Sequence, residues 1–288
     1  MKKLNNLEKT VSVIIPTFNR AKFLPTTLPT YYQECVKEII IINDCSTDNT
    51  LEVLDDIQKK IPILNVINAS KKLKQTGAKN LGIEAAKGEF LFFGDDDSII
   101  SSNAIYNLVT NYKKYGGCIS SLLHTYMAED TSIETVVKNF RNSTNVRNDI
   151  FNANTMKLNL SRKWNIDIEL PFCSAHFLVN SNDIGDKRFN ENFKGTCFRE
   201  ETYFILDIKQ SKHFNIFIDF NSWVINLPRQ GDSGGTQSYG FFTRKISEVY
   251  NEFIFFRDHG KYLSSYINFS SNPFIRSLMH VVNSFLKK

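Results

Sequence analysis

The stretch Gly88-Glu89-Phe90-Leu91-Phe92-Phe93-Gly94-Asp95-Asp96-Asp97 carries the strongest structural signal in the chain. Its four large apolar residues, bounded by glycines, predict a short and fully buried strand. Three acids follow at once, and an open α/β sheet presents ligands at the carboxyl ends of its strands. Crowded carboxylates repel one another and favour a bound cation, and their oxygen atoms suit a divalent metal. The alternative is a strand that runs into an acidic turn, because Asp also favours turns.

Length and composition describe an ordinary globular protein. The 288 residues are 42% hydrophobic and 23% charged, which allows one elaborate domain or two small ones. A net charge of +5 suits an anionic substrate or a membrane surface and does not indicate a nucleic-acid partner. The five cysteines show no CxxC pair, which favours a reducing compartment. Without a secretory signal or a bilayer-length apolar run, we expect a cytoplasmic protein, with a peripheral position at the inner membrane face as the alternative.

Alternating strand and helix patterns surround the acidic stretch. Strands are predicted at 11–15, 38–42, 64–67, 90–93 and 118–123. The helices between them span 21–33, the apolar face of Leu51, Leu54 and Ile57, the segment from a Thr76 cap to Lys87, and the segment from a Ser102 cap to Gly116. Short β-α links of this kind predict an α/β fold with a mainly parallel sheet and helices on both faces.

The second half of the chain is less regular. Residues 128–163 are rich in Asn, Thr and Ser and predict loop and irregular helix over the active-site face. A helix is expected at 198–209, a strand pair or one bent strand at 214–224, and a flexible loop at 228–235. Aromatic and basic helical segments follow from 241. We therefore expect a domain at 1–235, with a nucleotide-binding half at 1–125 and an acceptor half at 126–235, and a helical extension at 236–288.

Taken together and in this order, the motifs resemble those of the inverting glycosyltransferases of family 2, which have the GT-A fold and a DxD motif. The resemblance rests on the first strand and its loop, a nucleoside-binding loop, a glycine- and base-containing helix start, the run into the acids, the segment with the catalytic base, and a late glycine loop. These are residues 11–20, 42–50, 77–82, 88–97, 199–202 and 233–235.

The resemblance implies a hexosyl-type transfer, with inversion, from a nucleoside diphosphate sugar of UDP type. Asp97 would hold Mn²⁺ or Mg²⁺, and Asp95 would reach the metal or the ribose. Asp44 would accept from the ring N–H of a uracil-type base, and Lys79 could contact phosphate. Glu201 would be the general base, with Glu200 beside it. The remaining implied donor-binding residues are Pro16, Thr17, Asn19, Arg20 and Asp96.

Plain structural interpretations exist for several of these residues. Asp44 and Asp48 could be turn and capping residues, and Glu200 and Glu201 could be acids that favour the first turn of a helix. Lys79 could be a solvated helix residue, since lysine is usually exposed. His176, among apolar neighbours, is interpreted as a satisfied core or loop histidine.

Two positions depart from the family's pattern. Asp96 is acidic where many relatives vary, so the metal-binding acid could be misassigned by one position. Asn226 stands where the family often has a histidine that helps to hold the metal or the diphosphate, which puts a third ligand in doubt.

The expected acceptor is a glycan or a lipid-linked sugar in polysaccharide or cell-envelope synthesis. Two other functions remain open: a catalytically inactive sugar-nucleotide-binding scaffold, and a sugar-nucleotide pyrophosphorylase. The pyrophosphorylase is disfavoured because the loop after the first strand contains no glycine. The tail is expected either to close the core with a pair of helices or to lie on an anionic membrane as a basic interfacial helix.

Overall fold

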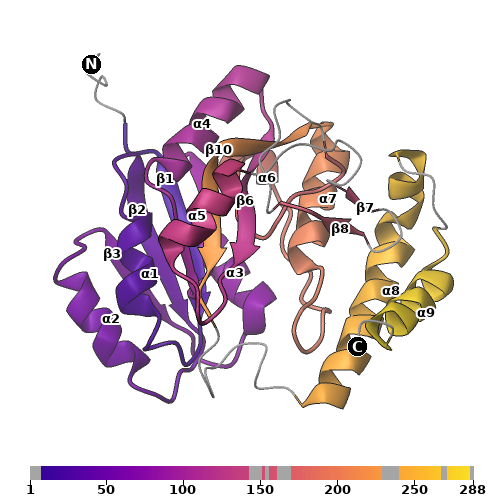
Figure 1. Ribbon diagram of the computed structural model, residues 1–288, viewed down its shortest axis with the longest axis horizontal. Helices are drawn as coiled ribbons and strands as arrows, with labels where there is room; N and C mark the ends of the chain where they lie inside the picture. The colour runs from indigo at the N-terminus through magenta and orange to yellow at the C-terminus, as the bar shows by residue number, and fades with distance from the viewer. Residues whose placement is uncertain are drawn as a thin grey trace.

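The structure is a computed structural model that describes residues 8–142, 151–152, 156–160, 170–228, 240–266 and 271–285. Its main sheet is formed by β1 (Val11–Thr17), β2 (Val36–Asn43), β3 (Leu64–Asn68), β4 (Phe90–Phe93), β5 (Ser98–Ile100), β6 (Ile119–Tyr126), β9 (Phe177–Asn180) and β10 (Ile216–Asn226). The strand order is β3-β2-β1-β4-β9-β6-β10-β5 (Figure 1). A separate small ribbon pairs β7 (Phe151–Asn152) with β8 (Lys157–Leu158).

The sheet is mixed but mostly parallel, which confirms the predicted fold class. Strands β1 to β4 pair in parallel, as do β6 and β10. The strand β9 was not predicted, and it lies antiparallel between β4 and β6. Its first three residues, FLV, form a short apolar run, which periodicity alone cannot assign to a strand. The segment expected as a strand pair or a bent strand is the single strand β10, whose register shifts between Asp219 and Trp223.

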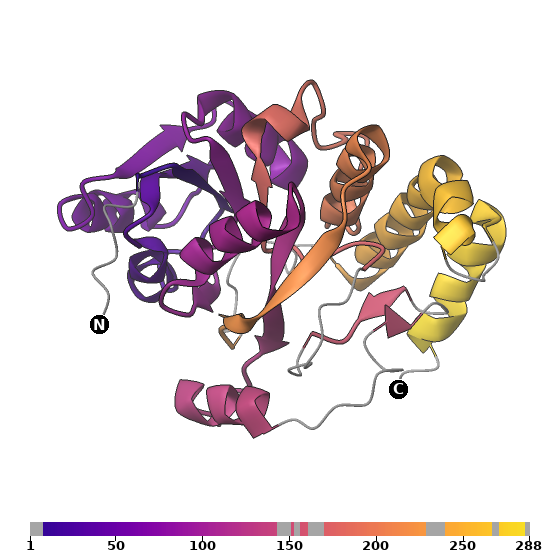
Figure 2. The same cartoon turned by 90° about the horizontal axis from the view of Figure 1, so that it is seen from above.

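Helices cover both faces of this sheet, as predicted. Helices α1, α2 and α4 pack on one face with Val13 and Ile15 of β1, while α3 and α7 lie on the other face (Figure 1). Figure 2 shows the remaining long helices, α8 and α9, gathered at the end of the molecule away from β3. The helices are α1 (Leu24–Tyr31), α2 (Thr50–Gln58), α3 (Lys74–Ala85), α4 (Ala104–Tyr115), α5 (Ile133–Asn142), α6 (Ser181–Ile184), α7 (Glu200–Lys212), α8 (Phe241–Tyr266) and α9 (Pro273–Phe285).

Several helix details differ from the sequence predictions. Thr76 does not cap α3, because the helix begins at Lys74 and its first amides bond to a carboxylate from another loop. Ser102 does not cap α4 either, since Asn103 in the left-handed conformation precedes that helix. Leu51 is exposed rather than inward. Part of 128–163 forms the regular helix α5, and another part forms the small ribbon of β7 and β8. Residues 143–150, 153–155 and 161–163 of that segment, and most of the predicted glycine loop, lie outside the described residues.

An aromatic cluster lies beneath the carboxyl end of β4. The ring of Phe93, the last residue of β4, packs against Phe177, Phe189 and Phe204 at centroid distances of 4.8, 5.2 and 5.8 Å. Phe204 belongs to α7 and stacks on Phe189 at 4.1 Å. Because β4 and α7 share this rigid core, the acids that follow Phe93 and the acids that open α7 are held at a fixed separation.

The C-terminal helices bear on the first expectation for the tail, that it closes the core; the membrane contact stays a prediction. Helix α8 buries Ile254, Phe255 and Phe256 in the protein interior, so it closes the core as predicted. Helix α9 packs on α8 with Arg276 buried, while Phe274 and Leu278 are exposed. No helix in the described ranges is both long and apolar enough to cross a membrane.

Candidate active site

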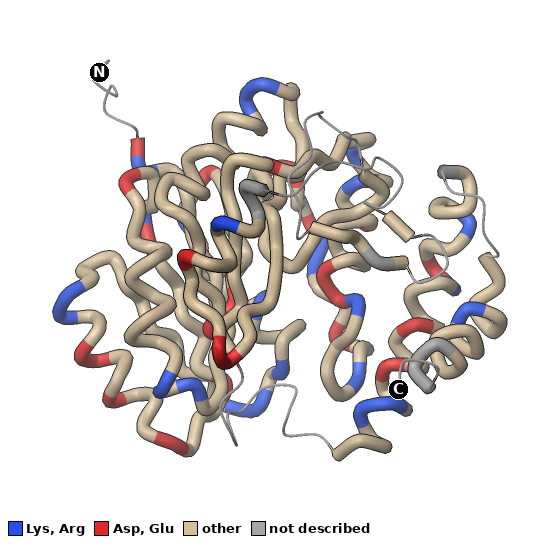
Figure 3. Tube along the Cα trace, in the orientation of Figure 1, with Lys and Arg blue, Asp and Glu red and all other residues tan. Residues whose placement is uncertain are grey.

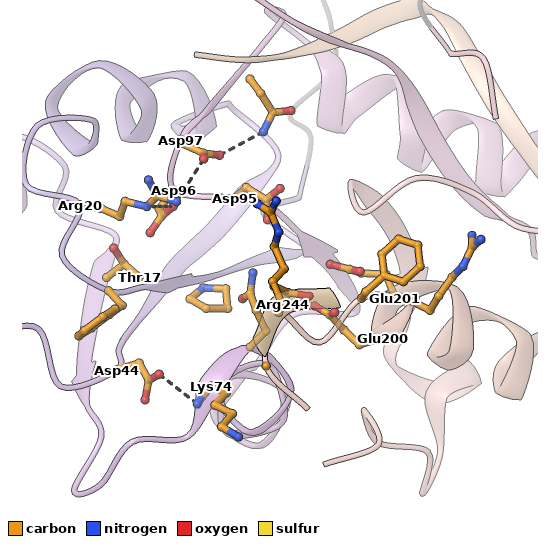
Figure 4. Close-up of a pocket in the computed structure, with 18 of the residues that line it drawn as sticks. Thr17, Arg20, Asp44, Lys74, Asp95, Asp96, Asp97, Glu200, Glu201 and Arg244 are labelled. Carbon is orange, nitrogen blue, oxygen red and sulfur yellow. Dashed lines mark hydrogen bonds and ion pairs between the residues drawn. The ribbon is translucent and has the colours of Figure 1, made fainter. Parts of the chain in front are cut away.

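A pocket of about 460 Å³ opens at the carboxyl ends of the parallel strands (Figure 4). This volume lies in the range of small-ligand sites. One wall comes from the loops after β1, β2 and β4, and the other from the start of α7, the end of β10 and the first turns of α8. The lining residues are Pro16, Thr17, Phe18, Arg20, Asp44, Lys72, Lys74, Gln75, Asp95, Asp96, Asp97, Tyr126, Gly195, Thr196, Phe198, Arg199, Glu200, Glu201, Asn226, Leu227, Arg244 and Glu248.

Most of the predicted donor-side residues meet here, but two lie outside the lining. Asn19 joins the loops after β1 and β2, because its Oδ1 accepts from the backbone N–H of Thr47 at 2.7 Å. Lys79 is buried behind the pocket wall with 1% of its surface exposed, so it is not the solvated helix residue that we considered. A phosphate contact by Lys79 would require a rearrangement of that wall.

Asp44 serves as the missing cap of α3. Its Oδ1 accepts from the backbone N–H of Leu73 at 2.6 Å and its Oδ2 from that of Lys74 at 3.0 Å. Lys72 Nζ lies 3.2 Å from the same carboxylate. Carboxylates are favourable at helix N-termini, which explains why a buried Asp is tolerated here. The expected capping role is therefore present, and contact with a nucleobase remains a prediction.

Two of the three acids after β4, Asp96 and Asp97, share Arg20 as a cationic partner. Arg20 lies 3.3 Å from Asp96 Oδ1 through its Nε and 3.4 Å from Asp97 Oδ2 through its Nη2. Burial raises the pKa of Asp95 and Asp97, and it raises that of Asp96 to about 7. Three partly desolvated carboxyls in one place leave this end of the pocket in need of additional positive charge.

The carboxylates fit a hard divalent cation by their donor chemistry. Asp95 and Asp97 both offer oxygen atoms to the pocket. Among the described residues, no group of three His, Cys, Asp or Glu side chains is arranged to hold a metal alone. The protein would therefore supply one or two carboxylates, and the remaining ligands of Mn²⁺ or Mg²⁺ would come from an anionic substrate and water, as is usual for Mg²⁺.

Asn226 lies next to these acids, at the position where the family often has histidine. Its Nδ2 donates to Asp97 Oδ1 at 3.1 Å, and its Oδ1 contacts Nε2 of His124. Behind them, His176 is fully buried with its Nε2 3.5 Å from Asp95 Oδ2. Burial lowers the pKa of His176 to about 3, so its ring is neutral. His176 is a core residue, as predicted, but neither ring nitrogen has a hydrogen-bond partner within the described part of the chain.

The two glutamates at the start of α7 share a buried cation. Lys79 Nζ lies 2.5 Å from Glu201 Oε1 and 3.2 Å from Glu200 Oε1. Burial and the neighbouring Glu201 charge raise the pKa of Glu200 well above its ordinary value. Burial opposes ionisation of Glu201 as well, but Lys79 and a hydrogen bond from Glu200 bring the pKa of Glu201 below its ordinary value. The arrangement favours a protonated Glu200 beside an ionised Glu201, which suits a general base.

Sequence reasoning missed the contribution of α8. Arg244 and Glu248 line the pocket from its first turns, and Arg244 Nε lies 3.8 Å from Glu248 Oε1. Figure 4 shows Arg244 pointing into the pocket, between the acids after β4 and the glutamates of α7 in that view. No local motif marks this arginine, because only the packing of α8 on the domain brings it to the site. Lys72, Lys74 and Tyr126 were also missed, although the basic loop 71–75 was a visible signal.

Comparisons with known proteins find sequence similarity to glycosyltransferases. A glycosyltransferase GlyG of Streptococcus pneumoniae is 32% identical over 104 residues, which cover 35% of each chain. A Campylobacter jejuni enzyme named GalNAc(5)-diNAcBac-PP-undecaprenol beta-1,3-glucosyltransferase is 34% identical over 117 residues, 38% of each chain. The matches therefore span well under half the length of these curated relatives.

The fold is also that of a solved structure. The S. aureus TarS crystal structure in complex with UDP-GlcNAc has a TM-score of 0.59 and 16% identity, over 88% of this chain and 73% of that one. The model of the family described as "Glycosyl transferase family 2" matches residues 12–185, which is more than half of the 288 residues. The chain therefore belongs to glycosyl transferase family 2.

Proposed function

We propose that the protein transfers a sugar from a UDP-type sugar nucleotide to an acceptor hydroxyl, with inversion at the anomeric carbon. One observation carries the proposal: carboxylates held after β4 and carboxylates held at the start of α7 line the same pocket. The first group suits a cation and a diphosphate, and the second supplies an ionised base. The TarS structures with UDP-GlcNAc and UDP support a donor of this type.

The donor side binds a negatively charged leaving group. Arg20, Lys72, Lys74 and Arg244 line the pocket and would attract the diphosphate. A divalent cation bound at Asp97 and Asp95 would act as a Lewis acid on that diphosphate. Pro16 and Thr17 would shape the nucleoside end, with Asp44 at the base.

The acceptor side provides the base. The acceptor oxygen attacks the anomeric carbon and gives its proton to Glu201, while the bond to the diphosphate breaks and its electron pair leaves with UDP. A single displacement of this kind inverts the anomeric configuration, as it does in enzymes that use separated carboxylates. Glu200 keeps its proton and donates a hydrogen bond to the Glu201 carboxylate.

The acceptor is proposed to be a cell-envelope glycan or a lipid-linked sugar. The names of two relatives specify polyprenol-type acceptors, one on undecaprenol and one on a dolichyl phosphate. Exposed aromatic side chains on the first turn of α8, Phe241 and Phe242, lie close in sequence to the pocket residue Arg244. We propose that this end of α8 and the exposed apolar side chains of α9, which include Phe274 and Leu278, contact the lipid surface that carries the acceptor.

The competing functions lack a comparable observation. A pyrophosphorylase would require a glycine-rich phosphate loop after β1, which the sequence lacks. A binding scaffold would have no use for an ionised Glu201 held by a buried lysine. Slow, metal-dependent release of UDP from a UDP-sugar in water would distinguish an enzyme from a scaffold.

UDP calorimetry tests the proposal directly. UDP should bind in Mn²⁺ or Mg²⁺, and chelation with EDTA should weaken binding severely because the acids then repel the diphosphate. Asp97→Asn should reproduce this loss in the presence of metal. Leu51→Asn, at an exposed α2 position outside the pocket, serves as the control and should bind like the original protein. Equal UDP affinity with metal and with EDTA would refute the metal-assisted part, and absent binding in both would refute the donor assignment.

A further inference from the structure

Residues 194–199, the six residues before α7, form a loop that connects the proposed base, Glu201, to the rest of the pocket wall. Gly195, Thr196, Phe198 and Arg199 line the pocket immediately before Glu200. The backbone here is unusual, because Cys197 and Arg199 both have positive φ, at 53° and 78°. Non-glycine residues adopt such angles only where the surroundings hold them. Contacts outside the loop must therefore maintain its shape, and with it the position of Glu201.

Helix α8 grips the start of this loop. Asn251 is completely buried, and its side chain bonds the backbone of Lys194 twice: Oδ1 accepts from Lys194 N at 2.8 Å and Nδ2 donates to Lys194 O at 2.9 Å. One turn earlier, Ser247 packs so closely on Gly195 that a Cβ at that glycine would lie 2.3 Å from Ser247 Oγ. The side-chain amide of Asn251 thus satisfies both backbone hydrogen-bonding groups of Lys194, as a neighbouring strand would.

Helix α8 also contacts the end of the loop, at Arg199. Glu252 is 3% exposed, and its carboxylate receives Arg199 Nε at 2.9 Å and Nη2 at 3.4 Å. Arg199 Nη1 also donates to the backbone oxygen of Met156 at 2.9 Å. His280 Nδ1 of α9 lies 4.0 Å from Glu252 Oε1. Buried and bidentate charge pairs are costly to break from one side, so this contact fixes Arg199 and the residue that follows it.

We propose that Asn251 and Glu252 are positioning residues of the transfer reaction, which hold the loop 194–199 so that Glu201 faces the acceptor. The C-terminal helix α8 is then a working part of the active site. This inference rests on the proposed function, since it takes Glu201 as the base. Displacement of a catalytic group by about 1 Å can cost roughly a hundredfold in rate. Small changes in the contacts made by Asn251 and Glu252 should therefore lower the turnover rate measurably.

The test uses the full chain and the variants Asn251→Asp and Glu252→Gln. The first keeps the acceptor for Lys194 N and removes the donor to Lys194 O, and the second keeps the shape of Glu252 and removes its charge. Each variant should lower the rate of UDP release from UDP-GlcNAc in water about tenfold or more. UDP affinity should stay within about twofold, because the nucleotide wall comes from other loops. Hydrogen exchange of the 194–201 amides should rise in both variants.

Asp258→Ala is the control. It removes another α7–α8 contact, in which Tyr203 donates to Asp258 Oδ2 at 3.0 Å, but leaves the loop untouched. It should lower thermal stability without a fall in UDP release. The inference would be overturned if hydrogen exchange at 194–201 were unchanged in Asn251→Asp and Glu252→Gln. It would also be overturned if the losses of turnover simply followed the losses of thermal stability across all three variants. If the unsubstituted protein fails to bind UDP, the proposed function falls, while the exchange experiment still decides whether α8 holds the loop.

Discussion

At the scale of single residues, the two adjacent glutamates are not equivalent. Glu201→Gln should lower turnover about a hundredfold or more, because the amide cannot take a proton from the acceptor. Glu200→Gln should be milder, since Glu200 is already protonated and its amide can still donate to Glu201. Both variants should bind UDP normally by calorimetry. A dead Glu200→Gln beside an active Glu201→Gln would place the base one residue earlier.

We expect Lys79 to set the pH at which Glu201, the proposed base, works. Burial would raise the pKa of Glu201, and the lysine keeps it low. A base must be ionised, so the rate falls as the pH drops through the pKa of Glu201. In Lys79→Met that pKa rises, and the acidic limb of the pH–rate profile should move to higher pH, with activity partly recovered in alkaline buffer. Lys79→Arg keeps the cation and should restore the original limb.

The other ionisable groups near this pair remain in both variants, so the comparison isolates the lysine. They are Glu200, Asp95, His176, Cys173 and Cys197. Because removing one member of a buried ion pair costs about 3–5 kcal/mol, circular dichroism must first show that Lys79→Met is folded at the assay temperature. Profiles of Lys79→Met and the original protein that coincide would show that the lysine does not tune Glu201.

Residues within contiguous motifs could be foreseen, and residues brought by packing could not. Arg20, Asp44, the acids 95–97 and both glutamates follow recognisable strand ends or helix starts, and all line the pocket. Lys79 also sits in a motif, yet its neighbours come from α7, more than a hundred residues away. Arg244 carries no local signal, because its position depends on how α8 docks.

At the scale of elements, the close contact between β1 and the start of β4 depends on Gly88. A Cβ at this position would lie 2.5 Å from Ser12 N and 2.7 Å from Thr10 O. Both are backbone atoms of the β1 region and cannot move aside cheaply. Gly88→Ala should therefore lower the free energy of unfolding by about 1–3 kcal/mol, as overpacking generally does. Denaturant unfolding measures this loss.

Gly240→Ala is the control for this prediction. A Cβ at Gly240 would have no atom within 4 Å, so the added methyl group should leave stability nearly unchanged. If Gly88→Ala were as stable as Gly240→Ala, the register of Val11 opposite Phe90 would not be as tight as the structure shows.

The elements with a clear period or composition were predictable, and those set by tertiary contacts were not. The strands β1, β2 and β4 contain near-continuous apolar runs, and the alternation of strands and helices along the chain implied a parallel sheet. The antiparallel β9 was missed because a run of three apolar residues is ambiguous alone. The start of α3 was misplaced because Asp44, thirty residues upstream of Lys74, supplies its cap.

At the scale of the whole molecule, several large apolar side chains of α8 and α9 are exposed. These two helices lie at the opposite end of the molecule from α2 (Figure 3). The two helices pack side by side: Phe253 meets Phe274 at a centroid distance of 5.0 Å, and His280 Nε2 lies 3.4 Å from Glu248 Oε2. Their exposed apolar residues therefore lie on neighbouring surfaces. They are Phe241, Phe242, Ile246 and Tyr250 of α8 and Phe274, Ile275, Leu278 and Val282 of α9.

This surface should bind anionic vesicles weakly. Basic residues should add little to the apolar contact, because Lys245 pairs with Glu248 and Arg257 pairs with Asp258. A basic residue near an anionic membrane surface contributes only about 1 kcal/mol to binding. Co-sedimentation with phosphatidylglycerol vesicles at low salt should therefore recover a modest fraction of the protein, and high salt should reduce it.

Substitution tests this membrane contact more cleanly than truncation after Ser271, because removal of α9 would uncover the face of α8 on which Arg276 is buried. The double variant Phe242→Glu with Leu278→Glu changes two exposed side chains and should stay in the supernatant, since charge at an apolar interface is expensive. Leu51→Glu on α2 also places an acid at an exposed leucine, and it should sediment like the original protein. Failure of the unsubstituted protein to sediment at low salt, or equal sedimentation of the double variant, would show that this surface does not face a membrane.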